Sequence, residues 1–194
     1  MKEVSENPLR LFTGIALPDA VRAFVARVAR SLSGEIEGVR WVPDENLHVT
    51  LKFLGDCDPA SVGDVLAAME VARGHLPFHL DIGGMGAFPS QASARILWVG
   101  AVDPSGRAAL LFADLEKALR RLGFARDKRP YRPHVTIGRA RRSAIRLPEG
   151  IGDRFAEVLP LEVRGITLYR SRLSSSGATY EILGRVGTGD ETGG

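Results

Sequence analysis

The chain has 194 residues, of which 44% are hydrophobic and 25% charged, a composition that suits one globular domain or two closely packed lobes. No apolar run is long enough to cross a membrane, and the segment MKEVSENPLR at the N-terminus lacks the apolar centre of a signal peptide, so we expect a cytoplasmic protein without membrane contacts. Cys57 is the only cysteine, which excludes an internal disulfide and a thiolate metal cluster.

The net charge of +3 is unevenly distributed along the chain. Ten of the 26 basic residues, but only one of the 23 acidic residues, lie between Arg120 and Arg146. A solvated charged face is the commoner outcome of such a run. A local positive field also attracts phosphates and other anionic partners.

The first third of the chain predicts a strand over 9–17, which Pro18 ends, and a helix from 18 to about 33. Apolar residues at helical spacing give this helix one buried face: Val21, Phe24, Val25, Val28 and Leu32. Gly34 is a fitting helix stop. A short strand over 39–42 and a strand over 47–54 follow.

The middle of the chain predicts a second helix over 58–74, since Asp58 is a good cap and Pro59 suits the first helical position. Alternation predicts a strand over 77–82, and small residues predict a loop over 83–93. Further along we expect a strand over 95–102 and a third helix over 105–122.

The last third begins with a basic loop over 125–133 that leads into a strand over 134–140. A helical turn over 153–157 and two strands, over 161–169 and 179–186, complete the expected elements. We expect one domain over residues 1–187 and a disordered tail over 188–194.

Two short stretches, His48-Val49-Thr50-Leu51 and His134-Val135-Thr136-Ile137, repeat each other at an offset of 86 residues. Side chains alternate along a strand, so each stretch places an imidazole and a hydroxyl on one face. Leu11 and Leu97, Gly14 and Gly100, and Pro18 and Pro104 match at the same offset. The repeat predicts a bilobal α+β fold whose two lobes are related by a pseudo-two-fold axis. Helices lie outside, and the motif strands line a central groove.

Two histidines without a metal suit in-line displacement at phosphorus. One neutral imidazole accepts a proton, one imidazolium donates a proton, and hydroxyls with a nearby arginine hold the phosphate oxygens. We expect no metal and no cofactor, because neither motif strand carries a carboxylate or a second histidine on the same face. A Ser-His-Asp arrangement and a Gly-rich phosphate loop are not indicated. His75 and His79 are expected to be structural.

Four stretches in order resemble the two-histidine (2H) phosphoesterase superfamily, and within it the RNA 2′,3′-cyclic phosphodiesterase family, formerly called the 2′-5′ RNA ligase family. They are RLFTGIALP over 10–18, LHVTLKFLGD over 47–56, YRPHVTIGRA over 131–140 and LYRSRLSSSGATYEIL over 168–183. The resemblance implies a bilobal α+β fold with two antiparallel sheets. It also implies hydrolysis, without metal, of RNA 2′,3′-cyclic phosphate ends to 2′-phosphate ends. Reverse 2′-5′ ligation is implied as a side activity.

The resemblance also implies residue roles. His48 is the expected proton donor to the departing 3′-oxygen, and His134 is the expected proton acceptor that activates water. Thr50, Thr136 and Arg139 are the expected phosphate-binding residues.

Several expectations stay open at this point. Arg132 and Tyr131 are possible RNA contacts, although Tyr131, Trp41 and Phe88 are each expected to pack rather than to stack on a base. Phe53 is expected in the core, because alternation places it opposite positions 48, 50 and 52. Alternatives are a phosphodiesterase for 2′,5′-linked or small cyclic nucleotides, and a non-catalytic RNA-binding module. The expected partner is RNA with a cyclic phosphate end, bound by a monomer without an obligate protein partner.

Overall fold

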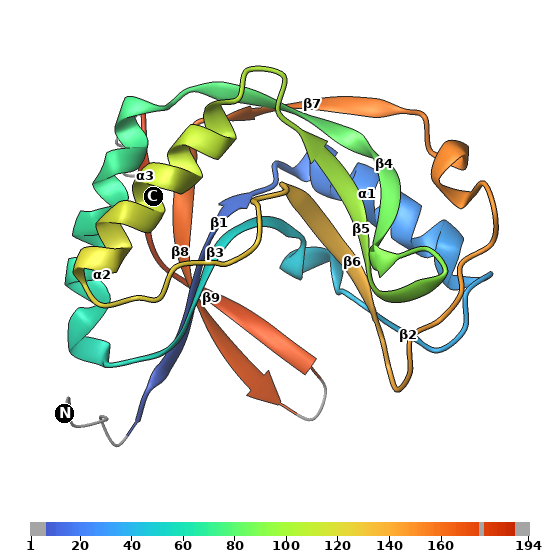
Figure 1. Ribbon diagram of the computed structural model, residues 1–194, viewed down its shortest axis with the longest axis horizontal. Coiled ribbons are helices and arrows are strands. Elements are labelled where there is room, and N and C mark those ends of the chain that lie inside the picture. The colour runs from blue at the N-terminus through green and yellow to red at the C-terminus, as the bar shows by residue number, and fades with distance from the viewer. Residues whose placement is uncertain (1–6, 175–176, 189–194) are drawn as a thin grey trace.

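The computed structural model describes residues 7–174 and 177–188, and within them one curled antiparallel sheet of nine strands carries three α-helices (Figure 1). The strands are β1 (Leu9–Ala16), β2 (Val39–Trp41), β3 (His48–Cys57), β4 (Phe78–Ser90), β5 (Ser93–Val102), β6 (His134–Ala140), β7 (Val158–Val163), β8 (Gly165–Ser174) and β9 (Gly177–Gly187). The helices are α1 (Asp19–Ser33), α2 (Val62–Met69) and α3 (Arg107–Arg121).

The α+β prediction is confirmed, and the two predicted sheets are the two halves of one sheet. One half has the order β9-β8-β1-β3 and the other has the order β6-β5-β4-β7, with β2 beside β6. The halves join where β3 meets β6, at the single residue pair Val49 and Val135. His48 and His134 each lie one residue from this pair, so the seam of the sheet brings the two motifs together.

Each half of the sheet packs against a helix from the other half of the chain. The first-half helix α1 packs against β6 and β7, whereas α3 packs against α2 and β3. Figure 1 shows α1 with β4, β5 and β6 on the right, and α2 with α3 on the left. This exchange makes the two lobes interdependent, because neither has a complete core without the other's helix.

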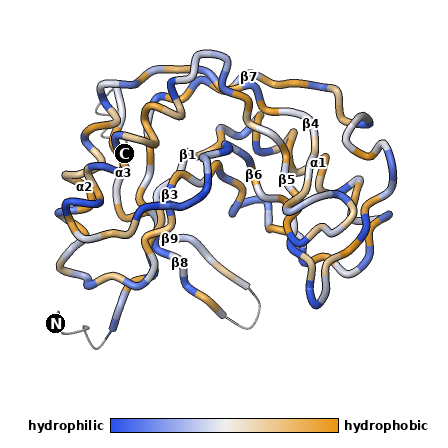
Figure 2. Tube along the Cα trace, viewed as in Figure 1, coloured by the Kyte–Doolittle hydropathy of each residue, from blue (hydrophilic) through white to orange (hydrophobic). Residues whose placement is uncertain are grey.

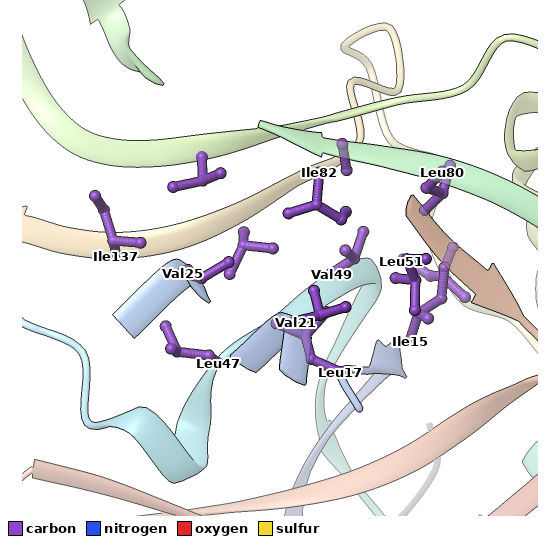
Figure 3. Packing of buried hydrophobic residues seen from close by; sticks show 14 of the residues in the cluster. Ile15, Leu17, Val21, Val25, Leu47, Val49, Leu51, Leu80, Ile82 and Ile137 are labelled. Carbon is purple, nitrogen blue, oxygen red and sulfur yellow. The ribbon is translucent and has the colours of Figure 1, made fainter. Parts of the chain in front are cut away.

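The core lies between the helices and one face of the sheet. The predicted apolar face of α1 is fully buried, and Figure 3 shows Val21 and Val25 of this helix packed among Val49 of β3, Ile82 of β4 and Ile137 of β6. Hydrophilic and apolar residues mix along all three helices in Figure 2, as expected of helices with one solvated face. No helix in the described part of the chain has the length and apolar character that a membrane crossing requires.

The prediction of a loop over 83–93 was wrong. Strand β4 continues through this stretch to Ser90, and it pairs along its length with β5 in a hairpin. The small residues have a packing reason: a Cβ at Gly86 would run into the ring of Trp98, and a Cβ at Gly83 would meet the backbone of Glu157. Glycine here permits close approach within a sheet rather than marking a turn.

The strand predicted over 161–169 is two strands, β7 and β8, separated at Arg164. They pair with β4 and β1 in opposite halves of the sheet, so the break lets the chain cross between halves. The helix predicted over 58–74 holds α2 between two short 3-10 helices, and the predicted turn over 153–157 is a 3-10 helix at Ile151–Arg154. Thr188 donates a backbone hydrogen bond to Arg164, and the rest of the predicted tail lies outside the described residues.

The offset of the repeat holds for the motif strands β3 and β6, but it differs in the strands β1 and β5 that pair with them. Ala16 lies opposite His48 on β3, and Gly100 lies opposite His134 on β6. Ala16 and Gly100 are therefore the structurally equivalent residues. The number of residues between them is two fewer than the number between the two histidines. The matched pair Gly14 and Gly100 is not structurally equivalent, because Gly14 lies opposite Thr50.

Candidate active site

The two motif histidines are held in the same way. The Nδ1 atom of His48 lies 2.7 Å from the carbonyl oxygen of Asn46, and Nδ1 of His134 lies 2.7 Å from that of Arg132. A carbonyl oxygen only accepts, so Nδ1 carries the proton in both rings. Each neutral ring therefore carries its lone pair on Nε2.

The His48 ring lies in an aromatic surround that sequence reasoning missed. Its centroid is 4.8 Å from that of Phe12, 5.8 Å from Tyr169 and 5.3 Å from Tyr180. Burial among these rings lowers the pKa of His48 to about 4, and the charge of Arg139 adds to this lowering. The ring is therefore neutral near pH 7 in the unliganded protein.

The His134 ring has its own aromatic neighbours, Phe88 at 5.1 Å and Trp98 at 6.2 Å between centroids. Burial and then the charge of Arg139 lower the pKa of this imidazole below its ordinary value of 6.5, against a raising effect of its bond to Arg132. Phe88, expected above to pack rather than to stack on a base, meets the His134 ring edge to face.

The threonines lie beside the histidines, as alternation predicted. Thr50 Oγ1 is 2.9 Å from Nε2 of His48, so its hydroxyl donates to the free lone pair of the neutral ring. Thr136 is half-buried, one residue beyond the Val135 seam and opposite Trp98. The seam thus gathers two imidazoles and two hydroxyls on one face of adjacent strands.

Both motif strands carry a β-bulge directly after the threonine. On β3, Thr50 and Lys52 are opposite consecutive residues of β1, which leaves Leu51 unpaired. On β6, Thr136 and Gly138 are opposite consecutive residues of β5, which leaves Ile137 unpaired. An extra residue reverses the alternation beyond it, so the fifth residue after each histidine turns to the histidine face.

The bulges place Arg139 in the site and overturn the expectation for Phe53. Arg139 is exposed, and its charge acts on His48, His134 and Tyr180. Phe53 is not in the core: it is 60% exposed, and its ring lies 5.8 Å from Phe12 on the His48 face. Strict alternation had assigned that face to Lys52.

Lys52 instead points to the helix face and is 3% exposed. Its ammonium forms an ion pair with Glu116 of α3 and donates to the carbonyl oxygen of Ala125 at 2.8 Å. Glu116 also accepts the backbone N–H of Asp127 at 3.2 Å. This buried network fixes the start of the basic loop that leads to His134.

The β8–β9 hairpin is tied to the His48 motif by a buried amide. Asn46 donates its side-chain N–H to the carbonyl oxygen of Ala178 at 2.6 Å. Tyr180, two residues further on, thereby reaches the His48 ring. The 168–183 stretch singled out above contains both tyrosines, Tyr169 and Tyr180, and its resemblance was the available signal for them.

Of the other residues singled out in the sequence, Tyr131 and His75 have structural partners, whereas Arg132 and His79 are exposed. The Tyr131 ring stacks on Phe112 at 4.4 Å, and its hydroxyl donates to the carbonyl oxygen of Thr50 at 3.4 Å. Arg132 is exposed. His75 pairs with Asp114 at 2.9 Å, and His79 is exposed on β4. Within the described ranges, no three His, Cys, Asp or Glu side chains are grouped to hold a metal.

The basic residues from 117 to 146 form no ion pair within the described chain, whereas many of those elsewhere do. Arg22, Arg27, Arg30, Arg154 and Arg164 each form an ion pair. In contrast, no Lys or Arg from 117 to 146 is paired with an acid of the described chain. Five of these cations line a cavity of about 890 Å³ between α3 and the basic loop: Lys117, Arg120, Arg126, Lys128 and Arg129. Their charge is thus available to an anionic partner.

The comparisons with known proteins cover most of this architecture. The family model "LigT like Phosphoesterase" matches twice in tandem, over residues 15–98 and 99–180. An RNA 2′,3′-cyclic phosphodiesterase of Archaeoglobus fulgidus is 32% identical over 176 residues, which are 90% of this chain and 98% of that protein. The sequence similarity to this relative therefore extends over nearly the whole of both proteins.

Two solved structures extend the match to three dimensions. The crystal structure of TT0787 of Thermus thermophilus aligns with a TM-score of 0.78 at 28% identity, over 92% of this chain and 97% of that chain. Escherichia coli LigT complexed with 3′-AMP aligns with a TM-score of 0.73 at 26% identity, over 93% and 98%. With its doubled motif, its tandem family match and its fold, the chain belongs to the LigT-like phosphoesterase family.

Proposed function

We propose that the protein hydrolyses RNA 2′,3′-cyclic phosphate ends to 2′-phosphate ends, with no metal in the reaction. The observation that carries the proposal is the pair of imidazoles at the sheet seam, each with Nδ1 bonded to a carbonyl and its lone pair on Nε2, which in His48 accepts from Thr50. The relatives' names, RNA 2′,3′-cyclic phosphodiesterase, supply the substrate.

In this mechanism His134 accepts a proton from water through Nε2 as the water oxygen bonds to phosphorus. The bond from phosphorus to the 3′-oxygen breaks, and His48 gives that oxygen a proton, which leaves a 2′-phosphate and a 3′-hydroxyl. Arg139 and the hydroxyls of Thr50 and Thr136 hold the non-bridging oxygens. His48 is neutral in the free site, so the bound anion must raise its pKa for it to act as the acid.

The same two groups also support a joining reaction on the same cyclic phosphate. A 5′-hydroxyl in place of water would give up its proton to His134, attack phosphorus and displace the 3′-oxygen. The product is a 2′-5′ linkage, and we propose this joining as a side activity.

An RNA substrate, rather than a small cyclic nucleotide, is favoured by the unpaired basic surface. The cavity between α3 and the basic loop has Tyr131 in its wall, three residues before His134. Its cations suit the phosphates of a strand whose end lies at the histidines. A mononucleotide would leave this charge unused.

The proposal is tested by incubating a short RNA with a 2′,3′-cyclic phosphate end in EDTA and identifying the product end. We expect a 2′-phosphate in the chelator, and a higher kcat/KM for the oligonucleotide than for a mononucleoside cyclic phosphate. Activity that disappears in EDTA and returns with a divalent ion would contradict the two-histidine mechanism. Equal kcat/KM for both substrates would contradict the RNA assignment.

The pH dependence of kcat/KM should differ from that of an ordinary imidazole pair. This parameter reports the free enzyme, in which the pKa values of both His48 and His134 are lowered from 6.5. One ring must be protonated and the other neutral, so both limbs of the profile should lie below pH 6.5. Above that pH, kcat/KM should fall about tenfold per unit as protonated imidazole becomes scarce.

The kcat profile should have its alkaline limb at higher pH, because the bound phosphate anion favours imidazolium. A rate series from pH 4 to 9 on one RNA substrate gives both profiles, with the exposed-histidine variant His79→Ala as the control. An alkaline limb of kcat/KM at or above pH 6.5 would contradict the conclusion that burial lowers the pKa values of both histidines.

A further inference from the structure

Arg10 is a cation on the histidine face of the sheet that the proposed mechanism does not use. Side chains alternate along β1, so Arg10 lies on the same face as Phe12, whose ring centroid is 4.8 Å from that of His48. The two residues of β1 are about 7 Å apart along the strand. Arg10 is exposed, so its guanidinium is open to a ligand that occupies the site.

The charge of Arg10 is not neutralised by an acid of the described chain. Asp56 is its cross-strand partner on β3, yet the two side chains form no ion pair. The arginines of the neighbouring strand β8 differ in this respect, because Arg170 and Arg172 both pair with Glu181, at 3.6 Å and 2.8 Å. An exposed cation that leaves a neighbouring carboxylate unused is available to an anionic ligand.

Arg10 and Arg139 come to the surroundings of His48 from opposite halves of the sheet. The Tyr180 ring lies 5.3 Å from that of His48, centroid to centroid. Burial raises the pKa of Tyr180, and the charges of Arg139 and Arg10 both oppose this effect. Arg139 also acts on both histidines, and the mechanism assigns it to the reacting phosphate. Two cations near one ring of the site suit a ligand with two phosphates.

Resting on the proposed function, we infer that Arg10 binds the phosphate on the 5′-oxygen of the terminal nucleotide. In the mechanism the departing 3′-oxygen faces His48, so its ribose lies on the half of the site that contains β1. The 5′-oxygen belongs to the same ribose, and in RNA it carries the last internal phosphodiester. The planar guanidinium suits this group, because its donors match two phosphate oxygens at once. Arg10 thereby recognises a phosphate that a nucleoside cyclic phosphate with a 5′-hydroxyl lacks.

The test adds one phosphate to a minimal substrate. The wild type and Arg10→Gln are compared on a nucleoside 2′,3′-cyclic phosphate with a 5′-hydroxyl, on the same compound with a 5′-phosphate, and on a dinucleotide in which that phosphate is a diester. In the wild type each added phosphate should lower KM about tenfold with little change in kcat, the size of one charge-assisted contact. Arg10→Gln should remove this advantage for both phosphorylated substrates. Arg10→Lys should keep part of it, because the charge remains and the planar fork is lost.

The matched control is Arg185→Gln. Arg185 is an exposed arginine of β9 that forms no ion pair in the described chain, and its charge acts on Tyr169 rather than on Tyr180. This variant should have the wild-type KM for all three substrates. An advantage of the 5′-phosphate that survives Arg10→Gln, or that Arg185→Gln removes instead, would overturn the assignment. An effect of Arg10→Gln on the 5′-phosphate but not on the dinucleotide would overturn the assignment to an internal phosphodiester.

A second measurement needs no turnover. Titration calorimetry compares a nucleoside 2′,5′-bisphosphate with the nucleoside 2′-monophosphate, and Arg10→Gln should weaken binding of the bisphosphate alone. This binding pattern in a protein that hydrolyses none of the substrates would sink the proposed function and keep the phosphate site at Arg10. Equal weakening of both ligands by Arg10→Gln would overturn the site.

Discussion

Replacing either His48 or His134 with glutamine is expected to lower kcat/KM for a cyclic-phosphate RNA end by about 10³-fold, within the range that general acid–base catalysis contributes. Glutamine fills much of the imidazole volume, so the aromatic surround of His48 stays packed. The double variant should be little worse than either single variant, because the two groups act in one transition state. Single-turnover rates measure these losses.

Thermal unfolding of the same variants is the first control, and His79→Ala, which removes an exposed histidine of β4, is the second. The histidine-to-glutamine variants should unfold at the wild-type temperature, and His79→Ala should have the wild-type kcat/KM. Full activity in both single variants would remove the histidines from the mechanism and leave the non-catalytic RNA-binding alternative.

A modified substrate separates the acid from the base. When sulfur replaces the bridging 3′-oxygen, the leaving group departs without protonation. The defect of His48→Gln should then shrink to less than about tenfold, whereas that of His134→Gln should persist, because water must still be deprotonated. If the modified substrate instead reduces the defect of His134→Gln, then His134 is the acid and His48 is the base.

The parts of the site that follow from local pattern were predictable from the sequence. Period-two alternation placed His48 with Thr50 and His134 with Thr136, and the structure holds each pair on one face. The helix α1 followed from apolar spacing, and its predicted face is buried. These features depend on contacts between residues close in the chain.

The features that were predicted wrongly or missed depend on contacts with residues that are not neighbours in the sequence. Lys52 and Phe53 exchanged faces because a bulge is defined by the opposing strand, and no residue type at Leu51 marks it. Glycines in β4 resembled a loop because the groups that crowd them, Trp98 at Gly86 and Glu157 at Gly83, lie elsewhere in the chain. The aromatic surround of His48 combines β1, β8 and β9, which meet only in the folded sheet.

The largest expected loss of stability comes from Lys52→Ala. The variant leaves the carboxylate of Glu116 buried without its cation, since this side chain is only 8% exposed and Lys52 is its ion-pair partner. Removing one member of a buried pair costs about 3–5 kcal/mol of unfolding free energy. Urea unfolding should report this loss, and Lys117→Ala, which removes an exposed lysine of α3, should stay within about 0.5 kcal/mol of wild type.

The double variant Lys52→Met with Glu116→Leu separates charge from packing. With neither charge left in the interior, it should recover more than half of the stability that Lys52→Ala loses. Recovery should be incomplete, because the carbonyl of Ala125 and the N–H of Asp127 lose their partners and the basic loop loses its anchor. A cost below about 1 kcal/mol for Lys52→Ala would mean that water reaches Glu116 and that the loop is held by other contacts. A double variant no more stable than Lys52→Ala would mean that the loop anchor, rather than the unpaired charge, dominates the loss.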